Sequence, residues 1–184
     1  VSGLERTGTG WRLAREDAAP VTADCLVLAI PGPQAAALLP EGVSVAALDA
    51  VAMEPCWTVM AAFDHPLPGP AVVDGEAAPL ARAIRDSGKP GRAREPDAWV
   101  LHADAAWTRA HLDDPADAVA DHLLAALAQR LSHAMPAPAT RMVHRWLYAR
   151  VSRPLGRPFH WDPALGLGLA GDWCAGPGLE AAWQ

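Results

Sequence analysis

The sequence predicts an α/β (α+β) fold, because apolar strands occur together with one long amphipathic helix. Residues 25–30 form an unbroken apolar run, "CLVLAI", which is the pattern of a strand covered on both faces of a parallel sheet. Residues 56–63 and 98–102 are two further apolar segments of strand length. Residues 115–133 place apolar side chains on one face at helical spacing.

The beginning of the chain predicts a hairpin, a strand and a short helix. Residues 1–16 contain a Thr-Gly-Thr-Gly turn between apolar flanks, and glycine supplies the positive φ that such a turn requires. The strand over 25–30 ends at Pro31. A short helix is expected over 34–39.

The middle of the chain predicts mixed strands and the long helix. Weak helical character is expected after Glu76, followed by a turn over 87–91. For the helix over 115–133, Asp114 is the expected N-cap and Pro115 the first helical residue. The expected buried face of this helix consists of Ala116, Val119, Ala120, Leu123, Leu127 and Leu131.

The remaining residues predict a strand over 141–149 and a Pro- and Gly-rich loop over 153–163. The last expected strand is "LGLGLAGDW", residues 165–173. A final helix is expected to begin at Gly178.

Charge and composition exclude several kinds of partner. A formal net charge of −6 over 184 residues argues against binding to nucleic acid or to an anionic membrane. The apolar runs are shorter than the roughly 20 residues of a membrane span. Cys25, Cys56 and Cys174 are widely spaced and the seven histidines are scattered, so neither a disulfide framework nor a metal site is expected. A reducing cytoplasm is the expected compartment.

The stretch "GLGLAGDWCAGPGLEAAW", residues 166–183, has the composition of a ligand-binding corner. Gly171 permits close approach to the backbone, the Asp172 carboxylate can accept hydrogen bonds from hydroxyl groups, and free N–H groups at the next helix start favour an electron-rich group. Ligands bind beyond the carboxyl ends of strands in open α/β sheets. The alternative is an ordinary turn in which Asp172 is a local cap.

Five stretches together resemble the flavin-dependent amine oxidase superfamily, and most closely its renalase-like bacterial branch. They are "ADCLVLAIPGPQAAALL", "IRDSGKPGR", "AWVLHADAAWTRAHL", "VHRWLYARVSRPLG" and "GLGLAGDWCAGPGLEAAW", in the family's order over essentially the whole chain. The resemblance implies an FAD-dependent oxidoreductase that oxidises a small molecule, an amine or a dihydronicotinamide-type donor, by hydride transfer to the flavin. The flavin does the bond chemistry, so no catalytic residue is assigned.

The resemblance also implies roles for individual residues. Asp172 would hold the ribityl or pyrophosphate region of FAD. The backbone at Gly178 and beyond would face the pyrimidine edge of the flavin. The expected cofactor-binding residues are Ile30, Pro31, Gly171, Asp172, Gly178, Leu179 and Glu180. Trp146 and Trp173 are candidates for the wall of the substrate pocket, with core packing as the alternative.

The basic turn "RDSGKPGR" is a second candidate site, for an anionic group such as the phosphate of a nicotinamide nucleotide, in keeping with NAD(P) binding. A solvated turn without a ligand is the alternative reading of the same residues.

The expected domain organisation has three segments. Residues 1–40 and 146–184 would form part of an FAD-binding domain, and residues 41–145 a substrate-binding domain with a mainly antiparallel sheet backed by helices. The family's N-terminal GxGxxG finger is absent, so we expect a segment of a longer protein that retains FAD poorly alone and can self-associate. The alternative is a non-enzymatic binding or interaction module of the same fold that has lost the flavin.

Overall fold

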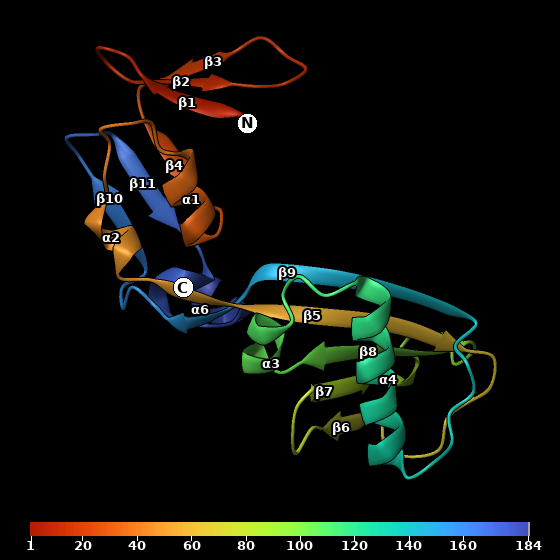
Figure 1. Ribbon diagram of the computed structural model, residues 1–184. Helices are drawn as coiled ribbons and strands as arrows, with labels where there is room; N and C mark the ends of the chain where they lie inside the picture. Colours follow the sequence, from red (N-terminus) through yellow and green to blue (C-terminus); the bar gives the residue numbers. More distant parts are fainter. Residues whose placement is uncertain (184) are drawn as a thin grey trace. The chain divides into compact units, whose positions relative to one another are not determined.

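A computed structural model describes residues 1–183, and the chain divides into two compact units. Unit 1 consists of Val1–Glu54 and Tyr148–Gln184, and unit 2 of Pro55–Leu147. Two long strands, β5 (Ala52–Phe63) and β9 (Thr140–Arg153), begin in one unit and end in the other. Helices occur with parallel and antiparallel strands (Figure 1), which confirms the α/β (α+β) class.

The first unit extends further along the chain than the segment 1–40 of the sequence analysis. Residues 41–54 lie in unit 1. They include the short helix α2 (Ala46–Asp49), which was not expected from the sequence. Leu48 of α2 belongs to the buried core of unit 1, and this packing explains why the segment groups with that unit.

The chain begins with a three-stranded antiparallel sheet in the order β1-β2-β3. The expected hairpin is confirmed: β1 (Gly3–Arg6) pairs with β2 (Trp11–Ala14), and β3 (Val21–Ala23) adds a strand that was not expected. The Trp11 indole N–H donates to the Leu165 carbonyl at 2.9 Å. This hydrogen bond ties the hairpin to the loop before the last strand.

The second sheet of unit 1 has the order β10-β11-β4. Its strands are β4 (Leu26–Leu28), β10 (Phe159–Asp162) and β11 (Leu167–Ala170). β4 and β11 pair in parallel, as the apolar run predicts.

Burial of this strand on both faces was a wrong prediction for the described chain, because Leu26 and Leu28 are buried whereas Val27 is 61% exposed. The buried side packs against residues from α1 (Gly32–Leu38) and from the helix after β11. No such core covers the side that carries Val27.

The closing segment differs from its expected form in two places. Residues expected to be loop contain β10. The last strand ends at Ala170, because Gly171 has φ of 155° and the short helix α5 (Asp172–Ala175) begins directly after it. A second short helix, α6 (Leu179–Trp183), follows at the expected position.

Unit 2 is built on a sheet in the order β6-β7-β8-β5-β9. It contains β6 (Val72–Asp74), β7 (Leu80–Arg85) and β8 (Asp97–Ala103), and the pairs β6–β7, β7–β8 and β8–β5 are antiparallel. The helical character expected after Glu76 was a wrong prediction. The β8 backbone supplies hydrogen-bond partners that local propensity does not anticipate, so the segment becomes β7.

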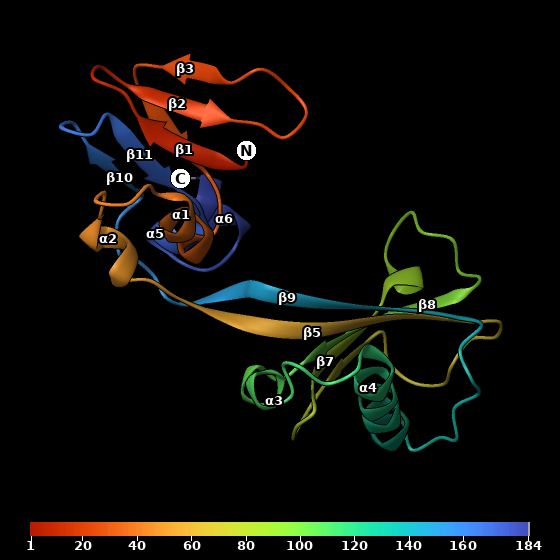
Figure 2. The same ribbon diagram turned by 45° about the horizontal axis from the view of Figure 1, so that its top comes forward.

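One face of this sheet is covered by α4 (Ala116–Leu131), as Figures 1 and 2 show. The prediction of Asp114 as its N-cap was wrong: Pro115 occupies that position, without a side-chain cap. Ala116 was expected to be buried but is exposed. The fully buried helix residues are Val119, Ala120, Leu123 and Leu127, all of them expected. Two short helices complete the unit, η1 (Asp86–Gly88) and α3 (Ala105–Ala110).

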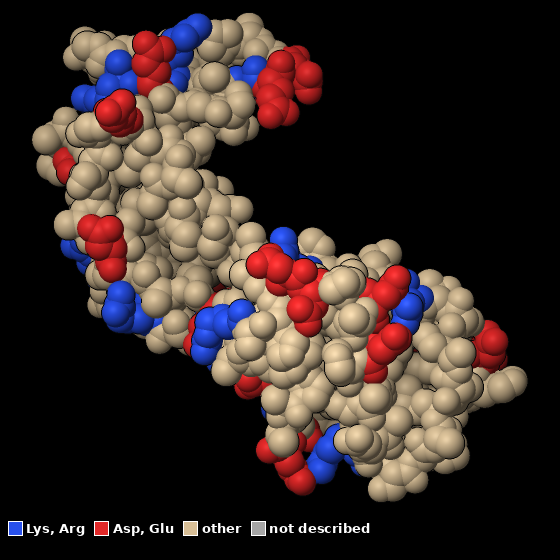
Figure 3. All heavy atoms as spheres, in the orientation of Figure 1, with Lys and Arg blue, Asp and Glu red and all other residues tan. Residues whose placement is uncertain are grey.

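The arrangement of charged side chains on the surface agrees with the absence of a strongly basic composition. On the face drawn in Figure 3, basic side chains lie among acidic ones rather than in one continuous patch. Within residues 1–183, no helix combines the length and the apolar character that crossing a bilayer requires.

Candidate functional site

Most of the expected site residues lie together at the corner after β11. β11 and β4 are parallel neighbours, so their carboxyl ends lie at the same edge of the sheet. β4 is followed by Ile30 and Pro31, and β11 by Gly171 and Asp172. Parallel pairing therefore brings together two stretches that are about 140 residues apart in the sequence.

Trp173 holds this corner together. Its indole N–H donates to the Ile30 carbonyl at 3.0 Å, which links the ends of the two strands. Its own carbonyl accepts from the Leu155 N–H at 2.9 Å. The side chain is 1% exposed and lies in the core of unit 1. Trp173 therefore forms the packed base of the corner.

A pocket of about 490 Å³ lies at this corner, within unit 1. Its volume falls in the range of about 300–1,000 Å³ that is usual for ligand pockets. It is lined by Ala29, Ile30, Pro31, Met53, Tyr148, Gly171, Asp172, Trp173, Gly178, Leu179 and Ala182. Six of the seven expected cofactor-binding residues are among them.

The absence of a side chain at Gly171 is required by the local geometry. A Cβ there would lie 2.6 Å from the Trp173 Nε1 atom, closer than any packed contact. At Gly178 the same added atom would meet nothing within 4 Å. Glycine at 171 therefore allows the Trp173 ring to sit under the corner, and glycine at 178 borders open space.

The letters of residues 166–171, "GLGLAG", spell GxGxxG, but they do not form a phosphate-binding turn. β11 occupies Leu167–Ala170, so the middle glycine lies inside a strand. A Cβ at Gly168 would approach Val27 Cγ2 at 3.1 Å. The pattern serves close packing between strands here, whereas the dinucleotide motif requires a turn that opens a helix.

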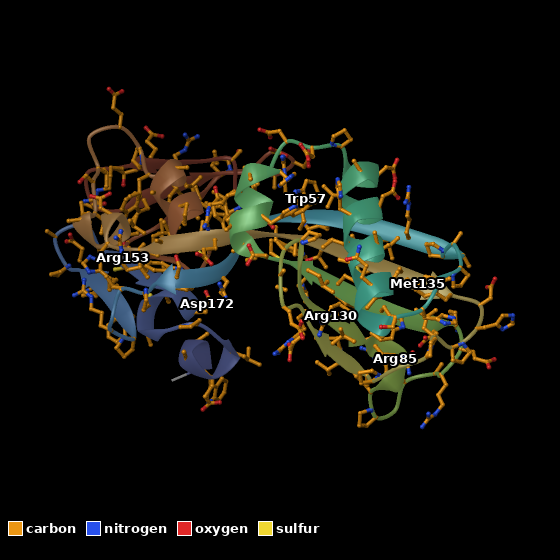
Figure 4. The ribbon with its side chains drawn as sticks, turned by 60° about the horizontal axis from the view of Figure 1, so that its bottom comes forward. Trp57, Arg85, Arg130, Met135, Arg153 and Asp172 are labelled. Atoms are coloured by element: carbon orange, nitrogen blue, oxygen red, sulfur yellow. The ribbon has the colours of Figure 1, made fainter. Side chains whose placement is uncertain are left out.

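Asp172 is the one acidic side chain that lines the pocket. Among residues 1–183, its carboxylate makes no hydrogen bond or ion pair. Figure 4 shows the residue on the short helix after β11. The alternative role as a local cap therefore has no side-chain bond to support it, and the carboxylate is available to a ligand.

Two expected site residues do not line the pocket. Glu180 lies on α6 but is not among the lining residues. Trp146 belongs to unit 2, where it is 53% exposed on β9. Trp173 does border the pocket, although its side chain is almost completely covered.

Sequence reasoning missed Met53 and Tyr148. Met53 lies near the start of β5 and Tyr148 within β9. Tyr148 is the only tyrosine of the chain, and it stands two residues after Trp146 on the same strand. Spacing of two residues on a strand places both on one face, and this pattern could have identified Tyr148.

Cys174 lies directly below the corner and is fully buried. Burial raises the pKa of its thiol and outweighs the opposing effects of the Gly171 backbone and Arg157, while the nearby Asp172 charge adds a smaller upward contribution. The thiol is therefore protonated near neutral pH and packs as a small apolar group.

The three cations of the basic turn "RDSGKPGR" lie beside two carboxylates of unit 2, those of Asp86 and Asp97. Lys89 donates to Asp86 at 2.7 Å, and Arg92 lies 3.6 Å from the same carboxylate. Arg85 Nε lies 3.3 Å from Asp97 without hydrogen-bond alignment, while its guanidinium donates to the Leu67 carbonyl. These pairings favour a structural turn over the anion site proposed from the sequence.

No family model matches the chain. Solved structures do share its fold. The chain is 20% identical to a candidate protoporphyrinogen oxidase from Exiguobacterium sp. 255-15, with a TM-score of 0.70 over 98% of this chain and 43% of that one. It is 14% identical to an oxidoreductase from Methanosarcina mazei, with a TM-score of 0.66 over 98% and 46% of the two chains.

A putrescine oxidase, solved with putrescine bound, gives 16% identity and a TM-score of 0.66 over 94% of this chain and 42% of that one. The chain thus spans less than half the length of each of these proteins. The similarity confirms, at the level of the fold, the resemblance drawn from the sequence motifs: the chain has the fold of a substantial part of these oxidases and oxidoreductases.

Proposed function

We propose that the chain is part of an FAD-dependent oxidoreductase of the amine oxidase or renalase-like type. The observation that carries this proposal is the pocket at the corner after β11, where Asp172 has no partner among residues 1–183. The proposed substrate is an amine or a dihydronicotinamide-type small molecule, and the proposed compartment is the cytoplasm.

The residues present fit a flavin nucleotide in three respects. The pocket has a volume of about 490 Å³, sufficient for part of such a ligand. The lining is mostly apolar, with few polar groups, as is usual for cofactor sites. The only carboxylate in it, Asp172, can accept hydrogen bonds from the hydroxyls of a sugar chain.

When bound, FAD would supply the electron-accepting chemistry, and the protein would supply its position. Asp172 would hold the sugar chain. Ile30, Pro31 and Leu179 would exclude water from the surface that they cover. Trp173 would fix the angle between the ends of β4 and β11, and with it the shape of the pocket.

The proposal is tested by titrating the purified chain with FAD and following the quenching of flavin fluorescence. We expect saturable binding that Asp172→Ala weakens by about 10- to 100-fold, which corresponds to a charge-assisted hydrogen bond of about 1.5–3 kcal/mol. Asp17→Ala is the matched control, because Asp17 is exposed and lies in the loop after β2. Equal FAD affinity in all three proteins would disprove the assignment.

The same titration separates the two candidate functions. A non-enzymatic module that has lost the flavin would show no saturable FAD binding, in the chain or in any longer protein that contains it. The pocket and the Asp172 carboxylate, which has no partner among residues 1–183, favour the flavoenzyme.

A further inference from the structure

The sheet of unit 2 has one face that neither α3 nor α4 covers (Figure 2). Side chains alternate between the two faces of a strand. The side chains of β5 and β8 that pack in the core beneath α4 are those of Trp57, Val59, Ala61, Phe63, Trp99, Leu101 and Ala103. The intervening side chains point the other way, and we call this surface the open face. It contains Cys56, Thr58, Met60, Ala98, Val100 and His102.

Strand β9 extends the open face. Val143 packs against the core, so its neighbours Met142 and His144, and Trp146 beyond them, lie on the opposite side of the strand. Met142 and Trp146 are 61% and 53% exposed. The ring centroids of His144 and Trp146 are 4.1 Å apart and the ring planes are tilted by 59°, so the two rings pack against each other.

One end of the open face is a shallow apolar hollow. A pocket of about 280 Å³ there is lined by Met60, Val100 and Met142, among others. In the β5–β8 register, Met60 pairs with Val100. Ala62 and Ala98, which also line the hollow, form the next pair. The hollow therefore occupies these two rows of the open face, and the row that contains Thr58 and His102 lies directly next to the Met60–Val100 row.

That neighbouring row carries a polar cluster. Thr58 and His102 face each other across β5 and β8, and Thr58 Oγ1 lies 3.3 Å from His102 Nδ1. Cys56 Sγ lies 4.0 Å from the same nitrogen. Since Thr58 is 4% exposed, its hydroxyl is held in place. It orients the imidazole and leaves Nε2 as the atom that can bind a ligand.

The imidazole of His102 is uncharged near neutral pH. Burial lowers the pKa of His102 from 6.5, and the positive charges of Arg82 and Lys89 lower it further. Both cations are paired, Arg82 with Asp74 at 2.6 Å and Lys89 with Asp86 at 2.7 Å. A neutral imidazole offers one donor or one acceptor to a ligand.

We infer that His102, oriented by Thr58, is the hydrogen-bonding residue of a substrate-binding surface that takes a flat, uncharged ring. The inference rests on the proposed function, which requires a substrate. The exposed Trp146 ring supplies a stacking surface, and the hollow at Met60 supplies an apolar one. His102 supplies the single polar contact, which fixes the orientation of the ring.

The charge pattern makes the surface a poor site for a dication. Asp86 is the carboxylate at the hollow, and Lys89 and Arg92 already neutralise it. Within residues 55–147, no unpaired carboxylate stands on the open face. Putrescine, which is bound in one of the similar structures, needs negative charge that this face does not offer.

The test is an equilibrium titration of the 184-residue chain with nicotinamide, followed by the NMR signals of the histidine rings. Nicotinamide is flat and neutral and carries one hydrogen-bonding carboxamide. We expect saturable shifts of the His102 signal and none at His133, which is exposed and lies just beyond α4. Putrescine should leave both signals unchanged. A His102 signal that does not respond to nicotinamide, or responds equally to putrescine, would overturn the inference.

Variants sharpen the test. His102→Phe keeps a ring but removes the nitrogen, and should weaken nicotinamide binding by about 3- to 10-fold, the effect of one neutral hydrogen bond. Thr58→Val should weaken it less, because the imidazole remains but is no longer oriented. His133→Phe is the matched control. The wild-type NMR result stands even if a variant fails to fold.

The FAD titration is run on the same proteins and keeps the two proposals apart. FAD binding without a response of His102 to nicotinamide rejects the inference and leaves the proposed function intact. A response of His102 in a chain that binds FAD neither alone nor within a longer protein supports the surface and rejects the proposed function.

Discussion

Asp97 in unit 2 and Asp172 in unit 1 are both partly or fully enclosed carboxylates, but their surroundings are opposite. Asp97 is 1% exposed and accepts hydrogen bonds from the Leu67 N–H, the Ser87 hydroxyl and the Trp99 indole. Asp172 borders a pocket and has no partner among the residues that the structure describes. One carboxylate is fully used by the fold, and the other is left for a ligand.

This difference shows how a structural carboxylate can be told from a binding one. A buried charge is tolerated only when it is paired and hydrogen-bonded, and Asp97 meets that condition within its own unit. Asp172 does not need to meet it, because the pocket keeps it in contact with solvent or ligand. Mutation of Asp97 should therefore lower the stability of the fold, whereas mutation of Asp172 should leave the stability almost unchanged and weaken ligand binding.

The largest expected effect is on Asp97. Asp97→Ala leaves three donors without their acceptor and removes the carboxylate that lies 3.3 Å from Arg85 Nε. It should lower the free energy of unfolding by about 3–5 kcal/mol. Urea denaturation followed by circular dichroism measures this loss. Asp172→Ala, measured in parallel, should stay within about 0.5 kcal/mol of the wild type. Similar losses in the two variants would remove the distinction between them.

The corner itself should be sensitive at Gly171. Gly171→Ala would place a Cβ 2.6 Å from Trp173 Nε1 at a φ of 155°, and should cost about 1–3 kcal/mol through overpacking and backbone strain. Gly156→Ala is the matched control, because Gly156 has φ of 82° and open space around it. The loss of stability in Gly156→Ala therefore measures backbone strain without overpacking. Equal losses in the two variants would mean that Trp173 has room to move.

A smaller effect is expected from pH. Burial opposes ionisation of Asp97, but the hydrogen bonds from Leu67, Trp99 and Ser87, with the charge of Arg85, together lower its pKa below 3.8. The unfolded chain then takes up this proton more readily than the folded chain. The stabilisation is therefore complete above pH 3.8 and is lost as the pH falls below it. Asp97→Asn should flatten the stability profile in that window.

The smallest effect concerns the uncovered side of β4. Val27 is 61% exposed and Trp161, on the same face, 44%. We propose that this apolar face allows the chain to self-associate weakly. Val27→Lys should then lower the apparent mass in light scattering at high protein concentration. Val72→Lys is the control, because Val72 is 49% exposed on β6 of unit 2. An unchanged mass in both variants would refute the proposal.

The sequence by itself determined the elements whose pattern is local. The glycine turn after β1 and the amphipathic spacing of α4 were both predicted from neighbouring residues. These features depend on backbone preference and on side-chain periodicity, which act over a few residues. The order of the five sequence stretches predicted the fold. The resemblance that they carry predicted six of the residues that line the pocket.

Only the tertiary structure decided which distant residues meet. The hydrogen bond from Trp173 to Ile30 closes the corner, and the β5–β8 register places Thr58 against His102. Strand registers are set by long-range pairing, and a shift of one residue would turn every side chain to the other face. For the same reason the segment after Glu76 became a strand and the exposure of Val27 could not be foreseen: partners far along the chain determine both.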